Sequence, residues 1–307
     1  MNRSKLIGAT ALASVMAASA AHAEMSISGL YAGKLTDTDG GGLAHTFSTN
    51  SIYVSYSDSM DNGMGVSVNM SVTDGAIKTD VNIDTGMGTV ALGNGVDSAV
   101  DGMDGSPACF SLNLCGSAMN ANYNDGDTAS GNSIGYSNSI GGISFAVTRG
   151  MEVAAADAVA TTATAIGTAA VEGMEPVTSI AAKTSIMGAS VAAGVSQIDN
   201  KGATADTDPS FVTVGYSLAG LSLGYAMYDG DNGGEETQMG VGTSMMGMSV
   251  GVTFAEADLA TDVDYTMISA SKGMGAASFG IDYTETDVAG TDTGDSDAWQ
   301  FTYIVGF

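Results

Sequence analysis

A short turn rich in Gly and Met, followed by a strand of alternating polarity, recurs along this 307-residue chain and constrains its fold more than any other feature. Side chains of a strand point alternately to its two faces, so each such strand has one apolar face and one small or polar face. Seven tight turns that alternate with eight long loops predict sixteen antiparallel strands. The turns are Asn62–Gly65, Gly86–Gly88, Ile140–Gly142, Met187–Gly188, Ala219–Gly220, Met246–Gly247 and Gly273–Gly275.

The alternation also locates the strands. In 276–285, for example, Phe279 and Ile281 share one face and Asp282 points to the other. In 210–217 the pattern leaves open which face points outward. The predicted strands are 25–36, 47–57, 65–73, 76–84, 88–93, 132–138, 142–149, 177–186, 189–197, 210–217, 221–228, 236–244, 248–256, 262–271, 276–285 and 298–307.

Two fold classes share this alternation, the soluble β-sandwich and the membrane-spanning barrel. The apolar faces of the clearest strands carry no charge and the opposite faces are small and polar, which suits lipid outside and water inside. After residue 23 no stretch reaches about 18 consecutive apolar residues, so no transmembrane helix is predicted. We therefore predict an all-β fold, a 16-stranded antiparallel transmembrane β-barrel with short periplasmic turns and long extracellular loops.

The beginning of the chain indicates export. Arg3 and Lys5 precede a short apolar stretch and a small-residue cleavage site at 21–23, which is the pattern of a secretory signal peptide. A membrane anchor is the alternative, but the apolar stretch is shorter than the about 20 residues that a spanning helix needs. We expect 1–23 to be a signal peptide and 24–307 to form the barrel.

The last strand, 298–307, carries an apolar and mostly aromatic face. The side chains on that face are Trp299, Phe301, Tyr303, Val305 and Phe307. Chain ends usually fray unless they are tied down, whereas a terminal strand in a barrel pairs along both edges. This strand therefore favours a closed sheet.

Composition excludes several classes of function. The chain has 34 Asp and Glu against 8 Lys and Arg, a formal net charge of −26, whereas nucleic-acid binding needs clustered basic residues. His45 is the only histidine after residue 23, and the sequence contains neither a Gly-x-Ser-x-Gly elbow nor a phosphate-binding loop. We expect no nucleic-acid partner, no enzymatic activity and no cofactor.

Two further features bear on disulfide and metal chemistry. Cys109 and Cys115 are the only cysteines, and in an exported chain a disulfide between them is favoured over a zinc site, which needs four ligands. Acid-rich loops leave calcium binding open, although a solvated acidic surface is the simpler interpretation. These loops are Asp37–Gly40, Asp125–Asp127, Asp229–Asp231 and Asp292–Asp297.

A long stretch without a clear strand pattern, 94–131, interrupts the series, and loops of this length usually have a function. The segments 88–93, 132–137 and 141–145 that flank it, together with the terminal strand, resemble the general-diffusion porins of Gram-negative bacteria, most closely the acidic porins of alphaproteobacteria. The resemblance implies a trimeric 16-stranded barrel in the cell outer membrane. It also implies that the third external loop, here 94–131, folds into the barrel and narrows it.

The resemblance further implies which residues form the constriction, with loop acids facing a basic wall. The expected loop acids are Asp97, Asp101 and Asp104. The expected wall residues are Lys34, Lys78, Asp80 and Lys183. Many members of the family carry an arginine cluster on this wall, whereas Arg149 is the only arginine after residue 23. Because low-dielectric walls focus the field of the carboxylates, we predict a preference for cations.

The function implied by the resemblance is passive diffusion of small hydrophilic solutes and ions through a water-filled lumen. The implied partners are identical chains in a homotrimer, outer-membrane lipid and lipopolysaccharide. The outer-membrane assembly machinery is expected to recognise Phe301, Tyr303 and Phe307 of the last strand. Two alternatives stay open, a substrate-specific channel on the same barrel and a secreted or surface-anchored β-protein with an adhesive or structural role.

Overall fold

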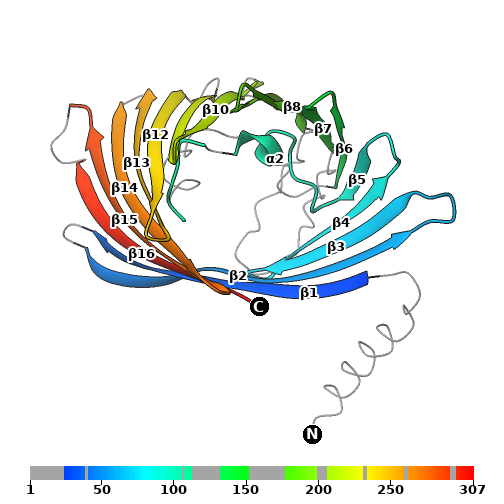
Figure 1. The fold of residues 1–307 in the computed structure, drawn as a ribbon, viewed down its shortest axis with the longest axis horizontal. Coiled ribbons are helices and arrows are strands. Elements are labelled where there is room, and N and C mark those ends of the chain that lie inside the picture. The colour runs from blue at the N-terminus through cyan, green and yellow to red at the C-terminus, as the bar shows by residue number, and fades with distance from the viewer. Residues whose placement is uncertain are drawn as a thin grey trace, which may run out of the picture.

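Sixteen strands form one closed antiparallel barrel, in which β16 pairs with β1 (Figure 1). The predicted 16-stranded barrel is thus confirmed by this computed structural model. It describes residues 24–38, 41–105, 107–112, 132–151, 177–198, 206–230, 234–258, 262–290 and 295–307. The strands are β1 (Glu24–Thr38), β2 (Gly42–Ser59), β3 (Gly65–Thr73), β4 (Ala76–Asp84), β5 (Thr89–Gly93), β6 (Ser133–Ile140), β7 (Ile143–Gly150), β8 (Val177–Ile186), β9 (Ala189–Ile198), β10 (Ser210–Leu218), β11 (Leu221–Asp229), β12 (Glu235–Met245), β13 (Met248–Asp258), β14 (Val263–Met274), β15 (Ala277–Val288) and β16 (Ser296–Gly306).

The connections follow the predicted asymmetry, with two exceptions. Short turns such as Met187-Gly188 close one end of the barrel. At the other end β1 ends at Thr38 and β2 begins at Gly42, where the predicted strands leave a loop over 37–46. There too, β3 and β4 are joined by Asp74-Gly75, in agreement with the predicted bounds 65–73 and 76–84 but not with the count of eight long loops. Asp74 (φ 49°) and Gly75 (φ 90°) both adopt the left-handed conformation, which an Asp-Gly pair favours in a two-residue hairpin turn. The expectation of eight long loops is therefore wrong at these two connections.

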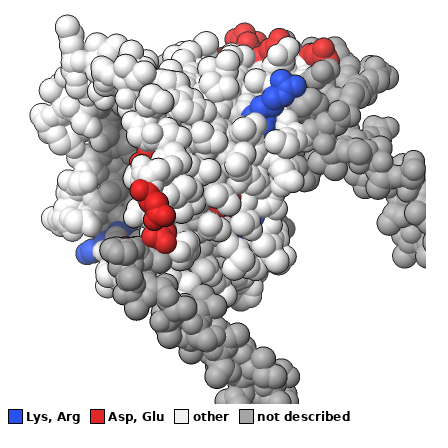
Figure 2. All heavy atoms as spheres, turned by 90° about the vertical axis from the view of Figure 1, so that its right-hand side faces the viewer, with Lys and Arg blue, Asp and Glu red and all other residues white. Residues whose placement is uncertain are grey.

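Most large apolar side chains lie on the outer surface, and polar side chains are buried on the inner face. Ile77, Phe254 and Ile281 are 60%, 51% and 46% exposed. In contrast, Thr253 of β13 and Thr302 of β16 are fully buried on the inner face. Figure 2 shows one side of the molecule, where most surface atoms belong to uncharged residues. A barrel presents such an apolar surface to lipid.

Strand β10 settles an orientation that the sequence left open. Val212 and Tyr216 are exposed on the outer surface, whereas Phe211 and Thr213 are buried on the inner face. The inner face of this strand meets a loop inside the barrel, described below. Packing against that loop distinguishes two faces whose polarity alone does not separate them.

The seam between the first and last strands closes the barrel. The Phe307 amide donates to the Gly29 carbonyl (3.0 Å), and the Gly29 amide donates to the Phe307 carbonyl (2.8 Å). A side chain at Gly29 would overlap the ring of Phe307, and one at Gly33 would lie 2.6 Å from Cζ of Tyr303. Because β16 also pairs with β15, the terminal strand is paired along both edges, as predicted.

The segment that follows β5 turns into the barrel. It carries the one helix of the described residues, α2 (Asp101–Asp104), which lies inside the ring of strands (Figure 1). The described parts of the predicted 94–131 loop are 94–105 and 107–112. In the described ranges no helix has the length and apolar character needed to cross a membrane.

Candidate functional site

The loop enters the lumen through a bend fixed by β4. The Asn94 side chain accepts a hydrogen bond from the Thr79 amide (2.7 Å) and donates one to the Ile77 carbonyl (3.0 Å). The Gly95 amide donates to the Thr79 carbonyl (3.1 Å). Gly93 adopts φ +141°, and a side chain there would overlap the Thr79 carbonyl. The bend therefore requires glycine at this position.

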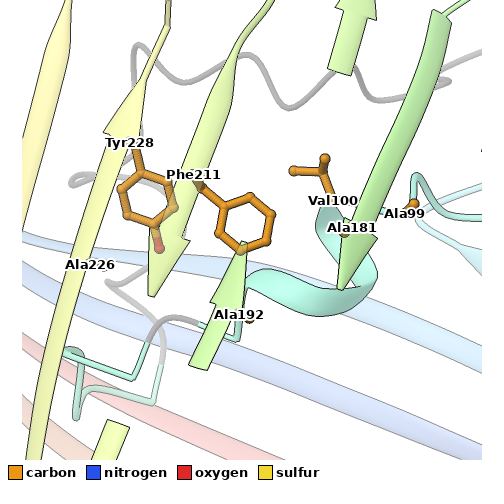
Figure 3. Close-up of a cluster of buried hydrophobic side chains, with 7 residues drawn as sticks. All are labelled: Ala99, Val100, Ala181, Ala192, Phe211, Ala226 and Tyr228. Carbon is orange, nitrogen blue, oxygen red and sulfur yellow. The ribbon is translucent and has the colours of Figure 1, made fainter. Parts of the chain in front are cut away.

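An apolar cluster holds α2 against the inner wall (Figure 3). Ala99 and Val100 of the loop pack on side chains from β8 to β11. The wall members of the cluster are Ala181, Ala192, Phe211, Ala226 and Tyr228. The Ala99 amide donates to the Thr148 hydroxyl (2.8 Å), and the Thr213 hydroxyl donates to the Asp104 carbonyl (2.9 Å). Burial of apolar surface in this cluster stabilises the docked position of Ala99, Val100 and α2 inside the lumen.

The next segment, 107–112, continues along the wall as far as β15. The Thr253 hydroxyl donates to the Ala108 carbonyl (2.8 Å). The Asp282 carboxyl group is hydrogen-bonded to the Ser111 side chain. Together with the α2 cluster, these contacts fix the described loop to the wall formed by β7 to β15.

Three predicted constriction residues meet in one recess. Asp97, Lys78 and Asp80 line a cavity of about 230 Å³ on the inner face of β2 to β4. Asp80 accepts hydrogen bonds from the side chains of Asn69 (2.8 Å) and Asn82, which fix its carboxylate, whereas Lys78 is exposed to the lumen. Asp97 also lines a second cavity of about 240 Å³, between the loop and β5 to β7. The recess offers one ammonium and two carboxylates to a passing solute.

Asp104 and Lys183 form a second charged group, at α2. Burial raises the pKa of Asp104 to about 6 and is the largest influence on it. A hydrogen bond from the Gly105 amide and the charge of Lys183 lower this pKa, while the charge of Asp101 raises it. The Lys183 ammonium lies 3.4 Å from the point that a Cβ on Gly105 would occupy. The structure thus places this wall lysine beside the loop acids.

Two basic residues lie away from the loop. Lys34 faces the lumen from β1, in one row with Thr302, and no contact found among the described residues joins it to a loop acid. Arg149 pairs with Ile134, which is exposed on the outer surface. Arg149 therefore faces outward and does not contribute to the lumen wall.

The cysteine and calcium predictions fall partly outside the described residues. Cys109 is disulfide-bonded, but Cys115 lies outside the described residues, so the pairing of the two stays a prediction. Within the described ranges, no group of three or more His, Cys, Asp or Glu is placed to hold a metal ion. Asp125–Asp127 and parts of the other acid-rich loops lie outside these ranges, so calcium binding there also stays a prediction.

Sequence analysis missed the wall residues that hold the loop. Thr148, Thr213 and Thr253 bind loop backbone, yet in the sequence they are ordinary small polar residues of alternating strands. The sequence did contain a signal that could have located the wall beneath the loop, namely glycine in strand interiors, where it is uncommon. It occupies inward positions of neighbouring strands at Gly224 and Gly240, among others.

A transmembrane barrel with a charged lumen and an inserted loop defines an outer-membrane channel. The chain belongs to the Gram-negative porin family, whose model matches residues 8–306. The predicted resemblance to porins is confirmed, and the family and fold are those of non-enzymatic outer-membrane channels. No curated protein matches the chain.

Solved structures share the fold at low sequence identity. A multiply substituted variant of the porin from Rhodopseudomonas blastica is 17% identical, with a TM-score of 0.63 over 92% of this chain and 100% of that one. OmpT, an outer membrane protein of Vibrio cholerae in its trimer form, is 10% identical, with a TM-score of 0.66 over 93% and 100%. At these identities the likeness shows the fold alone.

Proposed function

We propose that this porin is a water-filled channel for passive diffusion of small hydrophilic solutes and ions, with a preference for cations. The observation that carries the proposal is the recess in which Asp97 and Asp80 stand against Lys78. Two carboxylates against one ammonium leave a net negative charge beside the loop. Low-dielectric walls focus that charge on the water path, which attracts cations and repels anions.

The other predicted constriction residues adjust this charge. Asp101 and Asp104 add negative charge on α2, and Lys183 offsets part of it from the wall. Lys34 adds a positive charge to the lumen at β1, away from the loop. We propose that these residues set the degree of cation preference, while the inserted loop sets the size limit.

Single-channel recording in a planar bilayer tests the proposal. Purified folded protein is expected to give stepwise conductance and, under a KCl gradient, a reversal potential of the sign that cation selectivity produces. Folded protein that inserts without conductance contradicts the channel, and an anion-selective reversal potential contradicts the proposed role of the carboxylates.

Export and assembly are part of the proposal. A signal peptide over 1–23, outside the described residues, would direct the chain to the periplasm. The exposed aromatic side chains of Phe301 and Phe307, with Tyr303 on the same face, would be recognised by the outer-membrane assembly machinery. The apolar outer surface suits lipid, lipopolysaccharide and identical chains in a homotrimer. Cross-linking in native membranes tests the trimer, and a product of monomer size alone contradicts it.

A further inference from the structure

A set of glycines lies on the inner wall directly beneath the loop. Gly215, Gly224 and Gly240 face one another across β10, β11 and β12 in one cross-strand row. In the adjacent row, Gly242 of β12 pairs with Gly251 of β13. We name these five residues the glycine track. All five occupy positions whose side chains would point into the lumen.

The backbone does not require glycine at these positions. None of the five has a φ in the left-handed range, unlike turn glycines such as Gly188 (φ 84°). Glycine in a strand interior weakens the strand, because it loses more conformational freedom and packs no side chain. The local fold therefore favours other residues here, and the reason for glycine must be space.

Loop backbone occupies the space above the first row of the track. A Cβ at Gly240 would lie 2.7 Å from the carbonyl carbon of Ala108, and a Cβ at Gly224 would overlap the Pro107 carbonyl. Thr253, which pairs with Gly240 in the same row, donates its hydroxyl proton to the Ala108 carbonyl. This row combines a close approach of two backbones with a hydrogen bond that holds them together.

The ring of Phe110 occupies the space above the second row. A Cβ at Gly242 would lie 2.5 Å from Cδ1 and Cε1 of this ring, and a Cβ at Gly251 would lie 2.5 Å from Cγ. For Gly242 the nearest atoms all belong to that one ring. Loop backbone is thus the nearest obstacle at Gly224 and Gly240, and the Phe110 side chain is the nearest obstacle at Gly242 and Gly251. Gly215 is the least crowded of the five, with Cβ of Pro107 3.1 Å away.

We infer that the glycine track is a positioning element that sets the width of the pore, by letting 107–112 lie flat against β10 to β13. This inference rests on the proposed channel function. A side chain at any of the four crowded positions, from Gly224 to Gly251, cannot share its space with the loop, so the loop must move from the wall toward the centre of the lumen. Pore width is thus encoded in wall residues that never touch the solute.

Conductance of Gly240 variants tests the first row. We expect roughly a twofold loss of single-channel conductance for Gly240→Val, and a smaller loss for Gly240→Ala, because the free lumen becomes narrower. The matched control is Gly273→Val, an inward-facing glycine of β14 whose nearest Cβ neighbour is 3.9 Å away. Conductance of Gly240→Val equal to or above that of the native protein overturns the inference.

A double substitution tests the second row and does not depend on whether Gly240→Val folds. Gly242→Ala is expected to lower conductance in the native background. In a Phe110→Ala background the same change should have no effect, because the blocking ring is gone. An equal loss in both backgrounds overturns the role assigned to the ring.

Hydrogen exchange of 107–112 separates this inference from the channel proposal. If the native protein never conducts, the channel proposal fails. Faster exchange of this segment in Gly240→Val, with unchanged exchange in Gly273→Val, then still supports the track. Identical exchange in the native protein and Gly240→Val overturns the track, whatever the conductance.

Discussion

The two halves of the lumen wall differ in what they present to the interior. The half that holds the loop, β7 to β15, presents many small residues such as Ala192, Gly240 and Thr253. The opposite half, near β1 to β4, presents longer charged side chains, among them Lys34 and Lys78. The first half provides space and hydrogen bonds for the loop and also carries Lys183 beside Asp104, whereas the second half carries Lys34, Lys78 and Asp80. The strands that hold the loop are thus largely separate from those that form the charged recess.

Phe110→Ala should give the largest effect on the loop-bearing half. Loss of the ring that covers Gly242 and Gly251 should weaken docking of the loop by about 2 kcal/mol, less than for a fully buried ring. Hydrogen exchange of 107–112 should become faster and single-channel current noisier. Phe279→Ala, on the outer face of β15 opposite Tyr303, serves as the control. Unchanged exchange in Phe110→Ala would show that the backbone contacts alone hold the loop.

Thr253→Val tests the hydrogen bond on the same half. The change keeps the shape of the side chain but leaves the Ala108 carbonyl without its donor, at a cost of roughly 1 kcal/mol. Exchange of 107–112 should rise by less than in Phe110→Ala. Thr243→Val, which removes a similar bond to the Gly220 carbonyl at a turn, is the matched control and should leave the loop unchanged.

Lys78→Glu tests the charged half. A unit charge about 7 Å from an ion in water is worth roughly 0.6 kcal/mol, of which about 0.25 kcal/mol remains in 0.15 M salt. Reversal changes the charge by two units and acts in opposite directions on cations and anions, so the cation-over-anion permeability ratio should rise roughly fivefold. Lys272→Glu makes the same change on β14, opposite Phe279 on the outer face. The two variants are compared by reversal potential under a KCl gradient. If both shift it equally, the recess beside Asp97 does not control selectivity.

The smallest effect is expected from titration of Asp104, on α2, which packs against β8 to β10. Lowering the pH from about 7.5 to about 5 passes its pKa of about 6, so one negative charge is lost and cation preference should fall slightly. Because this pKa lies above the usual 3.8, protonation stabilises the docked loop. That stabilisation is complete below about pH 3.8 and is lost as the pH rises through about 6. In Asp104→Asn this part of the pH profile of the reversal potential should disappear; a profile identical to that of the native protein contradicts the assignment.

Alternation made the barrel predictable from the sequence, because it reports directly which side of a strand meets lipid. The predicted bounds 65–73 and 76–84 located the Asp74-Gly75 connection, but it was counted among the long loops although this dipeptide favours a two-residue hairpin turn. The resemblance to porins indicated a set of loop acids and a set of wall lysines, but not that Asp97 would lie near Lys78 or Asp104 near Lys183. The glycine track could not be predicted, since it depends on which inward positions of separate strands share a row. The register between strands decides which residues share a row, so the sequence of one strand alone does not reveal it.

The long sequence separation of the loop contacts has a consequence for the order of folding. Ala108 binds Thr253, which lies 145 residues later in the chain, and Asp104 binds Thr213, 109 residues later. Contacts this distant carry a large loop-closure cost and form late. The segment 107–112 cannot dock until β10 to β13 have paired, because these strands form the wall that it contacts. A nascent barrel therefore stays wide during assembly, and its narrowing is among the last events of its maturation.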